Sequence, residues 1–327
     1  MRARRLSAAD AGDASRWHTP RVSSLRLDAR PRTPGGVLVA AFRGWNDAGN
    51  AASIAAGFLR ARYADARFGV IDPDDYVDFQ ETRPRVLVGD DGARQIEWPE
   101  TELHNGALPD GRGLVVCTGP EPNLRWRRYA SELLEVVRLT EVSLVVTLGG
   151  LLADTPHSRP VPVTGSAYAQ ETIDRLGLRR STYEGPTGIV GVLHDACGAA
   201  GVESVSLWAA VPHYIGGNPN PSAGLALAQR LGRLLAVDLA PAELESASAE
   251  FDRQVATQVE TDPDVLRYVR ELEQASDEGD DQEWEAAENF DDAEQLRDSS
   301  TPESELHGKE IAATVNKAMD ALPEDLR

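Results

Sequence analysis

Residues 37–53 read V-L-V-A-A-F-R-G-W-N-D-A-G-N-A-A-S, and this stretch decides the fold. An apolar run at 37–42 breaks at Gly44, and an Ala-rich, helix-compatible run opens near Asn46 and Asp47. A short buried strand, a tight turn and a helix in this order are typical of the start of an α/β domain. The turn lies beside a helix N-terminus at the carboxyl end of a strand, where open α/β sheets usually carry their sites.

The turn after this strand has two interpretations. Gly44 and Gly49 have the spacing of the first two glycines of a Walker loop, but the Lys and the Ser or Thr that should follow Gly49 directly are missing. A G-x-G-x-x-G fingerprint is missing too. One interpretation is an anion or nucleotide cradle. The other, which we favour, is a strand-to-helix turn in which Asn46 or Asp47 caps the helix.

Composition limits the class of protein and its partners. The chain has 327 residues and a net charge of −20, so its surface repels nucleic-acid phosphates and anionic membranes. No apolar segment approaches the length that crosses a bilayer. The chain has only two cysteines, and they do not form a Cys-x-x-Cys pair, which favours a reduced, cytoplasmic compartment. We expect neither nucleic acid nor membrane as a partner.

Composition changes along the chain indicate four regions. A polar, Arg- and Ala-rich segment at 1–33 is expected to be flexible, and a core domain follows at 34–240. Amphipathic helices at 241–275 are expected to pack on the core or on a neighbouring subunit. The last region, 276–327, is expected to be acidic and partly disordered, with a terminal helix at 305–322. The stretch from 271 to 305 contains about fifteen acidic residues and only one Arg.

The core alternates apolar strands with helical stretches. Strands are expected at 37–42, 67–71, 85–88, 113–118, 143–148 and 204–210. Helices are expected at 46–63, 125–139, 169–176, 188–200 and 222–235. Continuously apolar strands such as 114–117 indicate that both faces of the sheet are covered. The pattern predicts an α/β fold, a three-layer α/β/α sandwich with a largely parallel sheet and a C-terminal helical appendage.

A loop at 149–162 follows one of these strands and carries Asp154, His157 and Arg159. These residue types would provide an acid, a base and an anion clamp in one loop. Alternatively, its turn formers and prolines make it a structural or interface loop. We favour the second interpretation.

Two further loops carry candidate residues. Glu184, in the segment 183–193, would act as a general acid, or it is a solvated carboxylate. His213 and Asn218, in the segment 211–221, would point into a cleft at the carboxyl edge of the sheet. Alternatively, the prolines of that segment shape a surface loop.

Sequence motifs for catalysis and metal binding are missing. No two of the six histidines have i, i+4 spacing, and none lies beside cysteines or carboxylates in a metal-ligand pattern. A serine nucleophile elbow is not legible either. We therefore expect no metal and no cofactor, and we assign no catalytic residue.

Two segments have the composition of protein interfaces, in which Tyr, Trp and Arg are enriched. The segment 76–84 contains Arg83, and the segment 122–128 places Trp126 among three arginines. These arginines would meet the acidic surface of a second copy. Alternatively, this is a solvated helix start with Trp126 tucked into the core.

Six segments, taken together and in order, resemble the proteasome assembly chaperone family in its stand-alone actinobacterial form. They are A-F-R-G-W-N-D-A-G-N-A-A-S (41–53), Y-V-D-F-Q-E-T-R-P (76–84), E-P-N-L-R-W (121–126), L-G-G-L-L-A-D-T-P-H-S-R-P (148–160), Y-E-G-P-T-G-I-V-G-V-L (183–193) and A-A-V-P-H-Y-I-G-G-N-P-N-P (209–221). The resemblance covers about residues 34–241 and extends to the helices that follow. It implies a phosphorylase/hydrolase-like α/β/α fold and self-association, with proteasome subunits as further partners.

The resemblance carries over no catalytic residues and has one departure. Family members that dock on the proteasome end in a hydrophobic residue, Tyr and any residue, whereas this chain ends Asp325, Leu326, Arg327. We expect a non-enzymatic, homo-oligomeric protein-binding or assembly-chaperone-like protein, with a trimer favoured. The alternative is a small-molecule protein of nucleoside or phosphate type, either a binder or a hydrolase- or phosphorylase-like enzyme that uses the loops at the strand ends.

Overall fold

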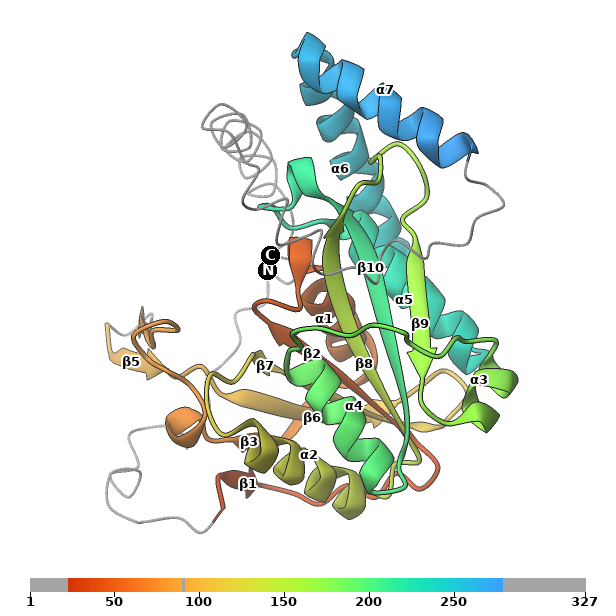
Figure 1. Cartoon of the computed structure of the whole chain (residues 1–327). Helices are drawn as coiled ribbons and strands as arrows, with labels where there is room; N and C mark the ends of the chain where they lie inside the picture. Colours follow the sequence, from red (N-terminus) through yellow and green to blue (C-terminus); the bar gives the residue numbers. More distant parts are fainter. Residues whose placement is uncertain (1–22, 90–91, 279–327) are drawn as a thin grey trace.

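The computed structural model describes residues 23–89 and 92–278, which form an eight-stranded sheet between two layers of helices (Figure 1). The start of the expected flexible segment, most of the acidic region and the helix expected at 305–322 lie outside the described residues. No helix of the described part of the chain combines the length and apolarity needed to span a membrane.

The sheet has a parallel centre and antiparallel edges. Its strands are β1 (Leu25–Leu27), β2 (Val37–Arg43), β3 (Ala66–Ile71), β6 (Thr101–Ala107), β7 (Gly113–Pro120), β8 (Leu144–Ala153), β9 (Val163–Ala167) and β10 (Glu203–Pro212). Their order is β1-β3-β6-β7-β2-β8-β10-β9. The ladders β7–β2, β2–β8 and β8–β10 are parallel, and β9 runs antiparallel to β10. The predicted α/β fold with a largely parallel sheet is confirmed.

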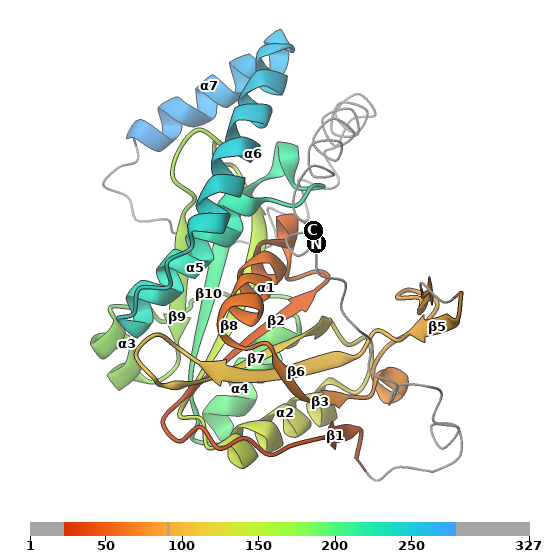
Figure 2. The same ribbon diagram turned by 180° about the vertical axis from the view of Figure 1, so that it is seen from behind.

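Helices cover both faces of the sheet. Helices α1 (Ala51–Tyr63) and α5 (Pro221–Leu235) lie on one face (Figure 2), and α2 (Trp126–Thr140) and α4 (Ile189–Ala199) lie on the other (Figure 1). The short α3 (Gln170–Leu176) follows the edge strand β9. The C-terminal appendage is a pair of helices, with α6 (Ala242–Glu260) on α5 and α7 (Pro263–Glu278) on α6.

The apolar run of β2 serves two cores. Val37 and Val39 are buried against α1 and α5, whereas Leu38 and Phe42 are buried against α2 and α4. Successive side chains of a strand point to opposite faces, so a central strand covered on both sides must be apolar throughout. A third, smaller core around Phe251 joins α6 and α7 to the 3-10 turn η5 (His213–Ile215).

The structure corrects the expected strand list. The strand expected at 85–88 forms as β4 (Arg85–Val88), but it lies outside the sheet and pairs only with β5 (Arg94–Glu97). All residues of these two strands are exposed, and the pair projects from the body of the protein (Figures 1 and 2). Sequence analysis did not predict the two edge strands, β1 and β9, or the interior strand β6, which lies between β3 and β7. Strand β1 falls within the segment 1–33.

The helix expected from residue 46 begins later, at Ala51. It is preceded by the 3-10 turn η3 (Ala48–Asn50), in which Gly49 has φ 58° and Asn50 has φ 51°. A side chain at Gly49 would place its Cβ 2.9 Å from the Cβ of Asn220. The turn therefore needs glycine for its left-handed backbone and for the close approach of the segment before α5.

Candidate binding surface at the carboxyl edge of the sheet

Asp47, in the turn after β2, caps helix α1. Its Oδ1 accepts hydrogen bonds from the backbone N–H groups of Ala52 (2.8 Å) and Ser53 (3.2 Å), and its Oδ2 accepts one from the Ser53 hydroxyl (2.5 Å). Burial raises the pKa of the Asp47 carboxyl, and these hydrogen bonds oppose the rise. The carboxylate is engaged by the helix, as the interpretation of a capped strand-to-helix turn requires.

Asn46 lies beside it and joins three elements. Its Nδ2 donates a hydrogen bond to Glu121 Oε1 (2.6 Å), and the backbone N–H of Ile189, at the start of α4, donates to the same oxygen (2.8 Å). A side chain at Gly188 would place its Cβ 2.1 Å from Asn46 Oδ1, so only glycine fits there. Glu121 thus links the ends of β2 and β7 to α4. Sequence analysis quoted it in a family motif but did not single it out.

A hollow of about 380 Å³ brings together four of the predicted residues. Gly44, Asp47 and Gly49 line it from the turn after β2, and Asn218 lines it from the segment before α5. Gly44 has φ 139°, which favours glycine. Asn218 is only 2% exposed, and its Oδ1 has no hydrogen-bond partner among the described residues.

The loop after β8 meets the C-terminal helices. Asp154 Oδ1 lies 3.1 Å from His213 Nδ1 and accepts a hydrogen bond from the Tyr268 hydroxyl of α7 (3.3 Å). The rings of His213 and Tyr268 pack edge to face, with centroids 5.5 Å apart. The predicted residues Asp154 and His213 therefore lie together, with an aromatic residue of the appendage as their third member.

His157 lies in the same loop and is held by η5. Its backbone N–H donates to the Tyr214 hydroxyl (2.7 Å), and its Nδ1 lies 2.8 Å from the same oxygen. Burial lowers the pKa of the His157 imidazole and raises the pKa of Tyr214. Both groups are therefore uncharged at neutral pH, and their contact fixes the loop on η5.

Arg159 pairs with α7. Its Nε and Nη2 donate to the two carboxylate oxygens of Asp277, at 2.8 and 2.7 Å, and its Nη1 lies 3.7 Å from Glu273 Oε1. This pairing raises the pKa of Arg159 and lowers that of Asp277. The anion clamp suggested by the sequence thus binds carboxylates of this same chain.

The remaining candidates lie apart from these groups. Arg83 and Glu184 are exposed, and neither has a hydrogen bond or ion pair within residues 23–89 and 92–278. Trp126 is half-buried against the core beneath α2 and α4, and its indole N–H donates to the Pro122 carbonyl. The structure does not bring Arg83 or Glu184 to the hollow.

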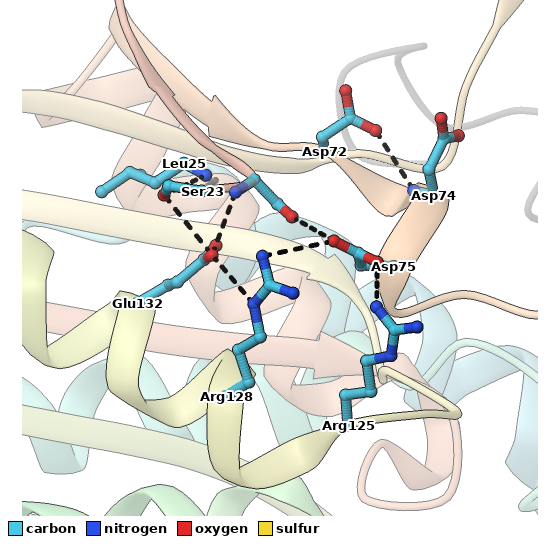
Figure 3. A network of polar contacts seen from close by, with 9 residues as sticks. Ser23, Leu25, Asp72, Asp74, Asp75, Arg125, Arg128 and Glu132 are labelled. Atoms are coloured by element: carbon cyan, nitrogen blue, oxygen red, sulfur yellow. Dashed lines mark hydrogen bonds and ion pairs between the residues drawn. The ribbon is translucent and has the colours of Figure 1, made fainter. Parts of the chain in front are cut away.

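The arginines around Trp126 are largely engaged within the chain. Arg125 contacts Asp75, and Arg128 lies 3.4 Å from the same carboxylate and 3.8 Å from Glu132 (Figure 3). The buried Glu132 also accepts a hydrogen bond from the backbone N–H of Ser24 (3.0 Å). Two of the three arginines thus hold the start of α2 against the 3-10 turn η4 (Pro73–Asp75), and of the three only Arg127 has a guanidinium without a partner among the described residues.

A larger depression of about 1320 Å³, here called the aromatic groove, opens on the side of the sheet that carries α4. Its aromatic lining residues are Trp45, Trp126, Tyr168, Tyr183 and Trp208. The Trp208 indole donates to Ser206 Oγ (2.8 Å). A Cβ at Gly149 would lie 2.5 Å from the Trp208 ring, so this glycine allows the indole to lie against β8.

The outer wall of the aromatic groove is a stacked pair of rings. Tyr168, which is 46% exposed, stacks on His194 with centroids 4.3 Å apart and an interplanar angle of 25°. His194 Nδ1 lies 2.8 Å from Ser204 Oγ. Burial lowers the pKa of His194 to about 4, so the pair is uncharged at neutral pH. Sequence analysis missed these residues because nothing in their local spacing distinguishes them from core residues.

Charged residues also line the aromatic groove, and most of them are positive. Four arginines line it, namely Arg127, Arg179, Arg180 and Arg230. Asp195 is the one carboxylate among its described lining residues. Within the part of the chain that the structure describes, no group of three or more His, Cys, Asp or Glu side chains could hold a metal ion.

Comparisons with known proteins agree with this fold. The model of the PAC2 family matches residues 41–259. The chain is 43% identical to a PAC2 family protein from Streptomyces avermitilis, over 72% of this chain and 99% of that one, with a TM-score of 0.66. It is also 43% identical to a proteasome-assembly chaperone homologue from Mycobacterium tuberculosis, over 71% and 99% of the two chains, with a TM-score of 0.64.

A more distant likeness extends to an archaeal proteasome activator from Pyrococcus furiosus. The two chains are 16% identical over 73% of this chain and 98% of the other. The TM-score of 0.60 shows a shared fold. Among curated proteins, none matches this chain.

Proposed function

This chain belongs to the PAC2 family, and we propose that it is a non-enzymatic, homo-oligomeric protein that binds other proteins as an assembly chaperone does. Proteasome subunits are its proposed clients. Support comes from the Mycobacterium tuberculosis relative, a proteasome-assembly chaperone homologue that is 43% identical.

The observation that carries this proposal is the lining of the aromatic groove. Trp, Tyr and Arg are the side chains that most often dominate the binding energy of protein interfaces. Here they line one open depression of about 1320 Å³, and Tyr168 is 46% exposed at its wall. A surface that offers rings and guanidinium groups side by side favours the binding of a polypeptide.

The polar residues at the carboxyl edge support binding rather than catalysis. Asp47 caps α1, Glu121 joins three elements and Arg159 holds α7. A catalytic acid or base must be available to the atoms of a substrate. These side chains instead hold the scaffold that presents the aromatic groove.

The test combines the oligomeric state with client binding. Light scattering after gel filtration should give the mass of two or more chains. Native gels with purified proteasome α and β subunits of the source organism should show a complex. The double variant Trp126→Ala/Tyr168→Ala should lose that complex and stay folded by circular dichroism.

Trp98→Ala provides the matched control, because Trp98 packs on Phe79 outside the aromatic groove. This variant should form the complex as the wild type does. A monomer that forms no complex with either subunit at micromolar concentrations would contradict the proposal.

A second candidate function is supported by the hollow beside Asp47. Its volume of about 380 Å³ lies in the range of small-molecule sites. The buried amide oxygen of Asn218 has no described hydrogen-bond partner, and leaving such a group unpaired is costly. A small polar ligand, of nucleoside or phosphate type, would satisfy it.

Thermal unfolding with inorganic phosphate and with nucleosides at millimolar concentration tests this second candidate. A bound ligand should raise the unfolding temperature of the wild type, because ligands stabilise the state that binds them. Asn218→Leu should abolish the increase. If neither ligand class raises the unfolding temperature, the hollow is not such a site.

A further inference from the structure

The aromatic groove is positively charged on a strongly acidic protein. The whole chain carries a net charge of −20, yet four arginines line the aromatic groove against Asp195 alone. Guanidinium groups bind carboxylates through paired hydrogen bonds and also stack on rings. The charge and the rings together indicate an occupant that is acidic and carries aromatic side chains.

Arg230 is the arginine of the aromatic groove that most clearly needs an acidic partner. It comes from α5 on the opposite layer and reaches the edge of the sheet, where its Nη2 would lie 3.8 Å from a Cβ built on Gly165 of β9. Its guanidinium has no ion pair or hydrogen bond within the described residues. Burial, together with the nearby Arg233, lowers the pKa of Arg230. A half-buried cation without a partner is stabilised when a carboxylate reaches it.

The end of α7 is tied to the loop that leads into β9. Arg159 binds Asp277 in the last turn of α7, and the loop that carries Arg159 runs directly into β9 (Figure 1). Thr164 and Ser166 of β9 line the aromatic groove. The last described residue, Glu278, thus follows directly on a residue that is tied to this loop.

The next segment has the composition that the aromatic groove requires. Residues 280–298 contain nine Asp or Glu residues against Arg297, together with Trp284 and Phe290. We propose that residues 280–298 bind in the aromatic groove of their own chain. Their carboxylates meet the arginines, and Trp284 and Phe290 pack on the exposed rings.

The connection makes this binding intramolecular. An extended chain spans up to about 3.3–3.6 Å per residue, so the residues from 279 to 298 span up to about 65–70 Å and can reach the aromatic groove by way of the loop that carries Arg159. A segment tethered this closely has an effective concentration in the millimolar range. It covers the surface that we assign to clients, and a client must displace it.

Photo-crosslinking in the full chain tests the placement. The photoreactive residue p-benzoyl-phenylalanine replaces Phe290, and cross-linked peptides are identified by mass spectrometry. We expect cross-links to peptides from 163–168 and 179–196 within one chain. Cross-links to other surfaces, no cross-links, or cross-links between a ¹⁵N-labelled and an unlabelled chain would overturn the proposal.

Titration with a synthetic fluorescein-labelled peptide of residues 279–298 tests the chemistry. The peptide should bind the full chain carrying Trp284→Ala/Phe290→Ala about tenfold more tightly than the wild type, because the tethered competitor is weakened. Adding Arg127→Gln/Arg230→Gln to that chain should weaken binding about tenfold. Equal binding to all three proteins would overturn the proposal.

Arg62→Gln serves as the matched control, since Arg62 is an exposed arginine of α1 that does not line the aromatic groove. In the same background it should leave peptide binding unchanged, apart from the general effect of one charge. Both experiments use the purified chain without a client. They can therefore fail while client binding holds, and client binding can fail while they succeed.

Discussion

The side-chain amide of Asn46 and the carboxylate of Glu121 are 75 positions apart in sequence and 2.6 Å apart in space. Their hydrogen bond joins the turn after β2 to the end of β7. The backbone N–H of Ile189 binds the same oxygen, so one carboxylate fixes the relative positions of three elements at the carboxyl edge of the sheet.

Glu121→Ala should lower the free energy of unfolding by about 2–3 kcal/mol, because it leaves the Asn46 amide and the Ile189 N–H without an acceptor. Glu121→Gln should cost less, since its amide oxygen still accepts both bonds. Urea denaturation measures the difference. The exposed Glu184→Ala, as a control, should stay within about 0.5 kcal/mol of the wild type. An unchanged free energy for Glu121→Ala would contradict this role.

Asp47→Ala should cost about 2 kcal/mol, because two backbone N–H groups and a hydroxyl lose their acceptor. Asp47→Asn should be close to the wild type at neutral pH, since its oxygen accepts from both N–H groups and its amide donates to Ser53. Urea denaturation of both variants at pH 7 gives the comparison, and equal losses would argue against capping.

Asp47 also predicts a pH dependence. Burial raises its pKa in the folded state above the ordinary value of 3.8, so the folded protein binds this proton more readily than the unfolded chain. The free energy of unfolding therefore falls as pH rises from about 4 to the folded pKa and is level above it. Asp47→Asn should lack this fall, which unfolding curves between pH 4 and pH 7 would reveal.

Arg159→Ala should loosen α7 without unfolding the core. Amide hydrogen exchange in residues 263–278 should accelerate, while exchange in β2 and β8 stays unchanged. Because Arg159 lowers the pKa of Asp277, their contact contributes above the ordinary pKa of Asp and is lost as pH falls through the folded value. Arg267→Ala is the control, since Arg267 pairs with Asp264 inside α7. Faster exchange in the control alone would refute this clamp.

His194 should make the protein acid-sensitive. Its folded pKa of about 4 lies below the ordinary value of 6.5, so stability is fully present above pH 6.5 and is lost as pH falls toward 4. Going from pH 7 to pH 5 should cost about 2 kcal/mol through this residue. His194→Asn keeps a polar atom near Ser204 and should lose correspondingly less over that range. Chemical denaturation at both pH values decides, and identical losses would count against His194.

Several elements of the fold could be predicted because their burial is visible in the local pattern of apolar residues. The apolar run of β2 must face two cores, and its period is visible without any knowledge of its partners. Strand β6 escaped prediction because it reads T-E-L-H-N-G-A: although it lies between β3 and β7, it carries polar residues at both buried and half-buried positions and so lacks an apolar run. The pairing partner of β4 was not visible, since a hairpin and a sheet strand have the same local pattern.

The candidate site was only half visible in the sequence. Asp154, His157 and Arg159 could be recognised in the sequence as a polar loop. Asp277, which forms an ion pair with Arg159, lies 118 positions further along the chain. Tyr168 and Trp208 were not legible, because their surroundings come from distant elements: Tyr168 stacks on His194 of α4, and Trp208 lies against Gly149 of β8. Side chains that meet through tertiary packing carry no common spacing along the chain.

The central position of β2 has a consequence for biosynthesis. Val37 aligns with Leu114 on one side and with Leu144 on the other, so the strand emerges from the ribosome long before either neighbour. At typical rates of translation of about 5–20 residues per second, β7 follows roughly 4–15 s later and β8 later still. Until β7 emerges, this buried apolar strand has no partner in the sheet. The nascent N-terminal part of this chain is where a ribosome-associated holdase would be needed.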